Sequence, residues 1–361
     1  MQQQESANLL GRYRLLKRIG RGGMGDVWLS EDPTLKRQVA IKTLPPHNQQ
    51  DQEYVVRFER EAQAAAALNH PHILPIHDYG DHIQADGQVI SYIVMPYLAG
   101  GSLEDRINAL AAAQQGMPVP EALRYLAQAA QAIDYAHEQG VIHRDIKPAN
   151  MLLRQDGYLM LADFGIARIV YSLEGVTQVG AGVGTPEYMP PEQAKGQAVA
   201  ASDNYSLAVI AYQLLTGRPP FSAETSYATM VQHMMLTPPP PRQFNPNLSP
   251  ACEEALLRGL AKSPTERFPT ATAFIEAIQR SLDPYSTAVQ HEQQAIASPQ
   301  TTGWSVDSLP LVQRNNNVTR RNVLIGTGVV AALAAAGGGG FWALKAFGTH
   351  PAPVKTQTMT P

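Results

Sequence analysis

The chain has 361 residues, of which 44% are hydrophobic and 16% are charged, and its formal net charge is -3. This length exceeds that of one average domain and predicts two lobes or two domains with a sizeable core. The charge gives no sign of a basic surface, so nucleic acid is not an expected partner. The single cysteine, Cys252, cannot form an intramolecular disulfide or a Cys-rich zinc site, which favours a reducing, cytosolic setting for the main domain.

The first 95 residues alternate short β-type runs with turn signals, and long helical patterns follow from residue 102 to residue 281. We expect five strands, at 13–20, 26–32, 37–44, 73–80 and 89–97. Residues 52–70 are rich in helix formers and predict one helix that packs on the sheet. The predicted fold class is α+β, with a small antiparallel β lobe and a larger, mainly α lobe.

A glycine-rich turn, GRGGMG, joins the first two predicted strands, with Gly20, Gly22 and Gly25 in G-x-G-x-x-G spacing. A dinucleotide site is disfavoured, because there the glycines open a helix inside a βαβ unit and here a second strand follows. A glycine-rich hairpin instead lets its backbone approach phosphates, and Lys42 at the end of VAIK can reach them. A lysine in the centre of a strand needs a counter-charge, and Glu61 on the inner side of the helix is the predicted partner.

The stretch VIHRDIKPAN, residues 141–150, concentrates polar chemistry in one loop, and DFG follows at 163–165. Taken singly, His143 could be a core histidine, Asp145 a turn former and Asp163 a side-chain cap. In this order and spacing the motifs resemble those of the eukaryotic-like serine/threonine protein kinases of bacteria, of the membrane-anchored kind. The similarity covers about residues 13–282 and implies a bilobal protein kinase fold.

The resemblance assigns a catalytic set to the loop and a nucleotide site to the cleft between the lobes. Asp145 would accept or orient the substrate hydroxyl proton, Lys147 would neutralise charge near the γ-phosphate, and Asn150 with Asp163 would hold magnesium, or manganese in its place. The residues implied to surround ATP are Gly20, Gly22, Gly25, Val27, Ala40, Lys42, Glu61, Met95, Pro96, Leu98 and Asp163. Pro96 departs from the acidic residue common in the family, but adenine is bound there by backbone groups.

The segment from 166 to 192 resembles an activation loop, and Arg144 beside Asp145 is a cation that a phosphorylated loop could pair with. Thr177 is the first expected phosphorylation site, with Ser172 and Thr185 behind it. The resemblance also implies a structural ion pair between Glu192 and Arg267. By the same resemblance, Asp203 would brace the catalytic loop. Pro190 and Ala208 replace residues that are more common in the family, and both changes should be tolerated.

Between Arg321 and Lys345 lie 23 uncharged residues, enough to cross a hydrocarbon core of about 30 Å. The alternative is a surface or buried Gly/Ala segment, since Gly337–Gly340 are poor helix formers. Upstream arginines predict a single-pass cell-membrane protein whose main domain faces the cytoplasm, although TRRNVLIG also resembles a twin-arginine signal. We expect a tail at 1–12, a kinase-like domain at 13–282 with lobes at 13–95 and 96–282, a flexible linker at 283–319, a transmembrane helix at 320–345 and an outer tail at 346–361.

The expected function is transfer of the ATP γ-phosphoryl group to Ser or Thr hydroxyls of proteins, including the chain itself, with a homodimer as the arrangement for phosphorylation in trans. Two other classes compete with this one. A pseudokinase or tethered scaffold would require loss of Lys42, Asp145 or Asp163, and none is lost. A small-molecule phosphotransferase is disfavoured by GTPEYMPPE, which resembles a peptide-docking platform.

Overall fold

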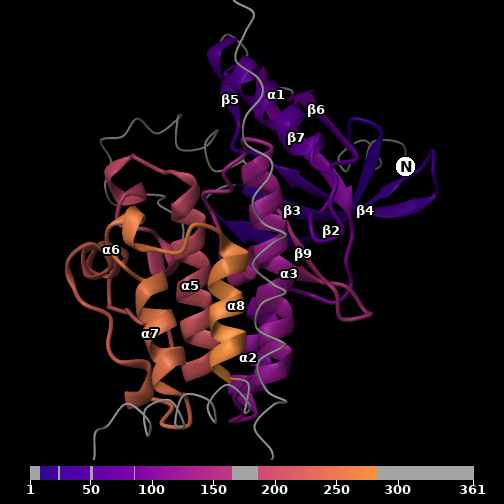
Figure 1. The fold of residues 1–361 in the computed structure, drawn as a ribbon. Helices are drawn as coiled ribbons and strands as arrows, with labels where there is room; N and C mark the ends of the chain where they lie inside the picture. The colour runs from indigo at the N-terminus through magenta and orange to yellow at the C-terminus, as the bar shows by residue number, and fades with distance from the viewer. Residues whose placement is uncertain (1–8, 23–24, 49–51, 85, 165–185, 283–361) are drawn as a thin grey trace, which may run out of the picture. The chain divides into compact units, whose positions relative to one another are not determined.

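The computed structural model describes residues 9–22, 25–48, 52–84, 86–164 and 186–282 (Figure 1). All described residues belong to one compact unit, Met1–Pro299. The predicted division into a small β lobe and a larger α lobe is confirmed. Residues 166–185 of the expected activation loop and the whole expected membrane segment at 320–345 lie outside the described residues.

The N-terminal lobe is one antiparallel sheet with one helix (Figure 1). Its elements are β1 (Leu9–Leu10), β2 (Tyr13–Gly22), β3 (Gly25–Asp32), β4 (Arg37–Thr43), β5 (His47–Asn48), α1 (Gln52–Ala66), β6 (Asp78–Ile83) and β7 (Gln88–Pro96). The strand order is β1-β2-β3-β4-β7-β5, with β6 also paired to β7. The sheet therefore places β3, β4 and β7 side by side, and these are the strands that carry most of the predicted nucleotide residues.

Strand β4 is buried on both faces, which explains its continuous apolar run. Val39 and Ile41 pack on one side against Tyr13 and Tyr92. Because side chains alternate along a strand, the residues between them face the other side, and there Ala40 joins the cluster that continues into the cleft. Lys42 shares this second face by the same alternation, so the strand itself directs the lysine toward the cleft.

The expected strand at 73–80 is wrong in its position, because β6 begins only at Asp78. Residues 73 and 74 pair instead with the helical lobe, where Leu74 donates its N–H to the carbonyl of Leu161 at 2.9 Å and Ile73 forms a bridge to the same residue. Pro75 has no N–H to donate to a sheet ladder, which keeps the segment out of the strand. Helix α1 also ends at Ala66 rather than near His70, shortly before Pro71.

The C-terminal lobe is mainly helical, with α3, α5 and α8 side by side and α7 against α5 and α8 (Figure 1). Its helices are α2 (Leu103–Ala112), α3 (Val119–Glu138), α5 (Ala200–Thr216), α6 (Ser226–Met235), α7 (Pro250–Gly259) and α8 (Ala271–Leu282). A hairpin of β8 (Met151–Leu153) and β9 (Leu159–Leu161) follows the loop that carries Asp145. Short 3-10 turns complete it at Pro148–Asn150, Pro186–Tyr188, Gln193–Lys195, Pro241–Gln243 and Pro264–Glu266.

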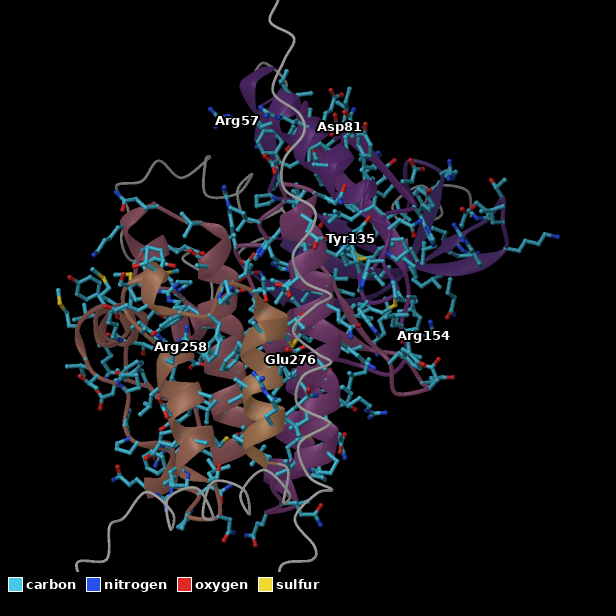
Figure 2. The ribbon with its side chains drawn as sticks, in the orientation of Figure 1. Arg57, Asp81, Tyr135, Arg154, Arg258 and Glu276 are labelled. Carbon is cyan, nitrogen blue, oxygen red and sulfur yellow. The ribbon has the colours of Figure 1, made fainter. Side chains whose placement is uncertain are left out.

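Burial follows the sequence pattern in this lobe. Helix α5 is buried almost all round, which fits its long uncharged run between Asn204 and Thr216. Charged side chains lie on the outside, as Arg57 of α1 and Glu276 of α8 illustrate (Figure 2). Within the described ranges, no helix combines the length and the apolar character that crossing a membrane requires.

Candidate active site

The loop between α3 and β8 is held by one buried aspartate. The N–H groups of His143 and Arg144 donate to the two carboxylate oxygens of Asp203, at 2.9 and 2.8 Å. Asp203 lies on α5 and is 1% exposed, and His137 of α3 contacts it at 2.7 Å. The prediction that Asp203 braces the loop backbone is confirmed. The brace matters because Arg144 has φ +67°, a left-handed conformation that a residue other than glycine rarely adopts.

Asp145, Lys147 and Asn150 form one polar cluster. The side-chain amide of Asn150 donates to the carboxylate Oδ2 of Asp145 at 2.9 Å and to its backbone carbonyl at 2.8 Å. The ammonium of Lys147 lies 2.9 Å from the same Oδ2. The carboxylate is therefore held in place by an amide and a cation, and its other oxygen stays available to accept a proton or a hydrogen bond.

Lys42 of β4 reaches across the cleft to Asp163, with Nζ donating to Oδ2 at 2.8 Å. Both side chains are shielded from solvent, at 7% and 16% exposure. Burial alone would raise the pKa of Asp163, but the charge and the hydrogen bond of Lys42 outweigh it and hold the pKa below its usual value. Asp163 is therefore an ionised carboxylate in the cleft at neutral pH.

The predicted ion pair between Lys42 and Glu61 is wrong for this structure, because among the ion pairs of described residues Lys42 is joined to Asp163. Glu61 lines a hollow between α1 and the segment before the catalytic loop, together with Arg60, Val141 and Arg144. The helix face was predicted correctly, but the position of α1 beside the loop directs Glu61 there. The periodicity of the sequence indicates which face of α1 is buried, but it does not indicate where the helix lies relative to the loop.

The two motif segments are joined by hydrogen bonds, so the predicted site residues do share one region. Ala162, directly before Asp163, donates its N–H to the carbonyl of Asn150 at 2.9 Å, and its own carbonyl is 2.8 Å from Nε2 of His143. The rings of His143 and Phe164 pack at 4.5 Å between centroids. Phe164 also lines a small hollow with Ile93 and other residues of the upper lobe.

An apolar cluster at the lobe junction contains Val27, Ala40, Met95 and Leu98, four of the residues predicted to surround ATP. Its members are Ala40, Leu44, Tyr54, Phe58, Leu74, Ile93, Met95 and Ala162, with Val27, Val55, Ile76, Tyr79, Tyr97, Leu98, Leu152 and Met160 packed against them. Ala40 pairs in register with Met95, and Pro96 with Val39, so β4 and β7 hold this wall together. Leu152 and Ala162 were not predicted. The only signal in the sequence was their place within two residues of Asn150 and Asp163.

The glycine-rich turn forms the end of the β2–β3 hairpin, with Gly22 opposite Gly25 and Gly20 opposite Val27. Residues 23 and 24 lie outside the described residues. Gly25 has φ +113°, and a Cβ there would lie 1.7 Å from the carbonyl oxygen of Thr43. The position therefore requires glycine on both conformational and steric grounds.

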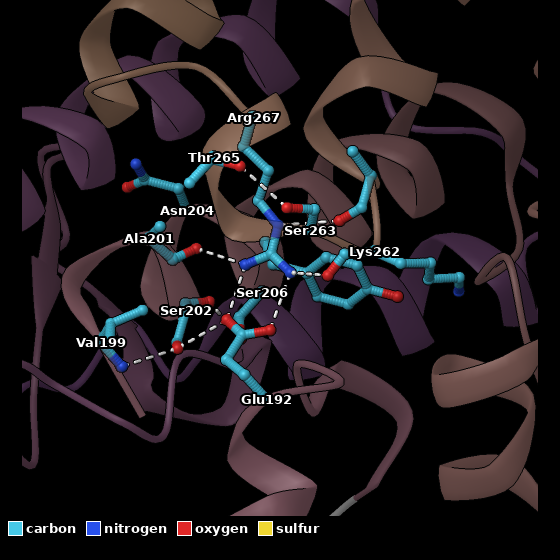
Figure 3. A network of polar contacts seen from close by, with 12 residues as sticks. Glu192, Val199, Ala201, Ser202, Asn204, Ser206, Lys262, Ser263, Thr265 and Arg267 are labelled. Carbon is cyan, nitrogen blue, oxygen red and sulfur yellow. Dashed lines mark hydrogen bonds and ion pairs between the residues drawn. The ribbon is translucent and has the colours of Figure 1, made fainter. Parts of the chain in front are cut away.

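The predicted pair of Glu192 and Arg267 is confirmed, and Figure 3 shows its network. The guanidinium donates to both carboxylate oxygens, at 2.7 and 2.8 Å, and its remaining N–H groups donate to the carbonyls of Ala201, Ala261 and Lys262. Ser202 adds a hydrogen bond to Glu192 at 2.7 Å. Burial alone would raise the pKa of Glu192. The hydrogen bonds from Arg267 and Ser202 outweigh this effect, so the pKa lies below its ordinary value.

A divalent cation fits the donor set that the cleft offers. The amide nitrogen of Asn150 is committed to Asp145, so its amide oxygen is the atom left for a cation, and Asp163 supplies a carboxylate. Both are the hard oxygen ligands that magnesium prefers. Throughout the described ranges no group of three or more His, Cys, Asp or Glu side chains could hold a metal. A cation here would thus need phosphate oxygens of the nucleotide as well.

The expected phosphorylation sites Thr177, Ser172 and Thr185 lie outside the described residues, as does Gly165. The structure resumes at Pro186, and Tyr188 and Met189 are buried. The hydroxyl of Tyr188 donates to Gln213 of α5 at 2.8 Å. The far end of the expected activation loop is thus anchored on the helical lobe.

Comparisons with known proteins agree with this geometry. The family model described as "Protein kinase domain" matches residues 13–278. The chain is 40% identical over 265 residues to serine/threonine-protein kinase PknB of Mycobacterium leprae, which covers 73% of this chain and 42% of the relative. It is 38% identical over 274 residues to serine/threonine-protein kinase PrkC of Bacillus subtilis, covering 76% and 41%. The matches therefore span about two fifths of the length of these curated relatives.

A solved structure is similar as well. The crystal structure of the Mycobacterium tuberculosis PknI kinase domain has a TM-score of 0.60 and 33% identity, and the match covers 76% of this chain and 97% of that one. The similarity in structure covers a similar share of the chain to the similarity in sequence.

Proposed function

Because the chain belongs to the protein kinase family, we propose that it transfers the γ-phosphoryl group of ATP to Ser or Thr hydroxyls of proteins. The observation that carries the proposal is the arrangement around Asp145. Its carboxylate is held by Asn150 and Lys147, and the loop that bears it is hydrogen-bonded to the segment that bears Asp163. The named relatives are serine/threonine-protein kinases, which supports these hydroxyls as acceptors.

Each residue has one task in this reaction. Asp145 accepts a hydrogen bond from the incoming hydroxyl, orients its oxygen and takes its proton as the bond to phosphorus forms. Lys147 and Lys42 are cations that offset negative charge on the transferred group and on the remaining phosphates. Asn150 and Asp163 would hold magnesium, which supplies further charge neutralisation when bound.

The nucleotide base fits the apolar cluster at the lobe junction. Val27 and Ala40 come from the upper lobe and Leu152 from the lower, so the cluster offers two faces to a planar ring. Leu98 retains a backbone N–H and Pro96 retains a carbonyl, which are the groups that can bind the base edge. We therefore assign ATP rather than a dinucleotide to this cleft.

We also propose that the chain phosphorylates its own activation loop, with Thr177 as the main site and one copy of a homodimer acting on another. Arg144, next to Asp145, is the cation that a phosphate on the loop would pair with. Support for this comes from the sequence motifs and from the anchored end of the loop at Tyr188.

Membrane anchoring through residues 320–345 is a further proposal, with the kinase domain facing the cytoplasm. It rests on the 23 uncharged residues after Arg321 and on the arginines that precede them. Fractionation of cells that express the full chain, before and after a carbonate wash, tests it. Retention in the membrane pellet supports the anchor, and release into the supernatant contradicts it.

Phosphosite mapping of the purified protein tests the catalytic proposal. We expect abundant phosphate on Thr177 in the parent, none in Asp145→Asn, and parental labelling in Asp156→Asn, a matched change at a solvent-exposed turn. Mixing the parent with Asp145→Asn should label the inactive copy if the reaction occurs in trans. Equal labelling of the parent and Asp145→Asn would exclude Asp145 as the catalytic residue.

A further inference from the structure

Arg144, the residue directly before Asp145, has an unfavourable backbone conformation. Arg144 has φ +67°, which costs a residue other than glycine on the order of 1 kcal/mol or more. Such a conformation persists only where the surroundings fix it. The carbonyl of Arg144 and the N–H of Asp145 belong to one planar unit, so whatever fixes this carbonyl also fixes the bond that leads to the Cα of Asp145.

Three side chains contact the backbone around this point, and one of them, His143, accepts the N–H of Asp145 on its Nδ1 at 3.2 Å. Asp203 accepts the N–H of Arg144 at 2.8 Å. Gln193 donates from its amide nitrogen to the carbonyl of Arg144 at 2.8 Å. Asp203 was expected from sequence, whereas the role of Gln193 was not, although Gln193 directly follows the quoted stretch GTPEYMPPE.

Gln193 is itself attached to a rigid part of the lobe. It follows Glu192, whose carboxylate is held by Arg267 and Ser202, and it begins a 3-10 turn at Gln193–Lys195. Its side chain is half-buried, and its reach to Arg144 spans 49 positions in the sequence. The contact therefore connects the anchored end of the expected activation loop to the catalytic loop.

We propose that Gln193 is a positioning residue for Asp145: its amide orients the peptide plane before Asp145 and so sets where the carboxylate meets the substrate hydroxyl. The inference rests on the proposed kinase function. It predicts that loss of the Gln193 amide slows phosphoryl transfer itself and leaves ATP binding at the lobe junction unchanged.

The test compares Gln193→Met with Gln197→Met in the full-length protein. Methionine keeps the length of the side chain but has no N–H donor, and Gln197 is an exposed glutamine four residues along. The readout is single-turnover transfer from labelled ATP to dephosphorylated Asp145→Asn chain as substrate, over a range of substrate concentrations. We expect the maximal rate to fall about tenfold in Gln193→Met, a factor that corresponds to the free energy of about one hydrogen bond, and to be parental in Gln197→Met.

A second variant gives a readout that a purely structural role would not move. In Gln193→Glu the side chain can donate to the Arg144 carbonyl only when its carboxyl group is protonated. The rate relative to the parent should therefore rise as the pH is lowered from 8 toward about 5.5, approaching the Glu pKa. A relative rate that stays flat over this range contradicts the proposal.

The outcomes separate the inference from the function on which it rests. An inactive parent overturns the kinase proposal. An active parent with Gln193→Met within twofold of its maximal rate overturns the positioning role alone. A rate loss accompanied by weaker ATP binding and a lower melting temperature also overturns it, since that pattern indicates general damage to the fold.

Discussion

Lys42 with Asp163 in the cleft, and Glu192 with Arg267 in the helical lobe, are both buried ion pairs with hydrogen-bond lengths of 2.8 and 2.7 Å. Their surroundings differ. All five N–H groups of Arg267 have acceptors within the protein. Lys42 has three N–H donors, and among the described residues the structure gives its ammonium one hydrogen bond, to Asp163.

The comparison indicates how a structural ion pair differs from a functional one. A buried charge whose partners are all supplied by the fold contributes a fixed geometry and binds nothing more. A buried charge with unused donors or acceptors retains electrostatic attraction for a ligand of opposite charge. By this criterion Lys42 and Asp163 are available for phosphates and a cation, and Glu192 and Arg267 are not.

The largest expected effect is on stability, at the structural pair. Glu192→Gln leaves the guanidinium of Arg267 buried without its counter-charge, which should lower the free energy of unfolding by about 3–5 kcal/mol. Urea denaturation of the parent and the variant measures this, with Glu276→Gln on the exposed face of α8 as the matched control. A loss no larger than that of the control would contradict the structural role.

The functional pair should give the opposite result. Lys42→Met removes a cation from the phosphate site, and we expect phosphoryl transfer to fall by about 10²–10³-fold, the usual effect of deleting one electrostatic group from an active site. The loss of stability should be under about 1.5 kcal/mol, since 16% of the Asp163 side chain stays exposed and the charge of Lys147 also acts on this carboxylate. A stability loss equal to that of Glu192→Gln would remove the distinction between the two pairs.

A pH-dependent effect is expected from a buried neutral group in the same lobe as Arg267. Burial, and then the charge of Lys262, lower the pKa of His233 to about 4. The unfolded chain takes up this proton below about pH 6.5 while the folded chain does not, so stability is full above that pH and falls as the pH drops. Between pH 7 and pH 5 the loss should be about 2 kcal/mol.

Replacement of His233 by a residue that does not titrate tests this assignment. His233→Gln keeps a polar partner for Tyr205, which contacts Nδ1 at 2.9 Å. Urea denaturation at both pH values should show a smaller pH dependence in the variant. An identical pH dependence in both proteins would assign the effect to other groups.

The smallest expected effect concerns packing between α5 and α7. A Cβ at Gly259 would lie 2.8 Å from the Cβ of Ala208 and 2.9 Å from the ring of Phe274. Gly259→Ala should therefore destabilise by about 1–2 kcal/mol through overpacking, and less when combined with Ala208→Gly. Gly116→Ala is the control, because nothing lies within 4 Å of an added Cβ there. Equal costs in both backgrounds would contradict the contact.

The contact between Gly259 and Ala208 also explains why the alanine at position 208 is tolerated. Ala208 stands where a glycine is common in the family, and the missing Cβ of Gly259 on α7 leaves room for it. The two residues are far apart in the chain, so no local pattern joins them. The tolerance of Ala208 was predicted, but its cause required the packing of α5 against α7.

Local patterns predicted most of the elements, and long-range contacts decided the rest. Strands β2, β3, β4 and β7 follow from alternation and turn residues, and their bounds agree with expectation to within three residues. The strand expected at 73 starts later because Ile73 and Leu74 pair with Leu161, 87 or more positions away.

In the candidate active site, too, local motifs were predicted and long-range contacts were not. The motif residues were found because each lies in a short stretch of fixed spacing, as Asp145 and Asn150 do. The partner of Lys42 was not predicted correctly, because the choice between Glu61 and Asp163 depends on where α1 lies relative to β4. Gln193 was missed for a similar reason, since nothing in its own segment points to Arg144.

The most direct test of the central claim is ATP affinity of the full-length protein measured by calorimetry with magnesium and with a chelator. The claim is that Asp163 keeps a free coordinating oxygen beside its bond to Lys42. We expect magnesium to tighten ATP binding in the parent and to have little effect in Asp163→Asn, while Glu187→Gln behaves as the parent. An equal magnesium effect in the parent and Asp163→Asn would contradict the account.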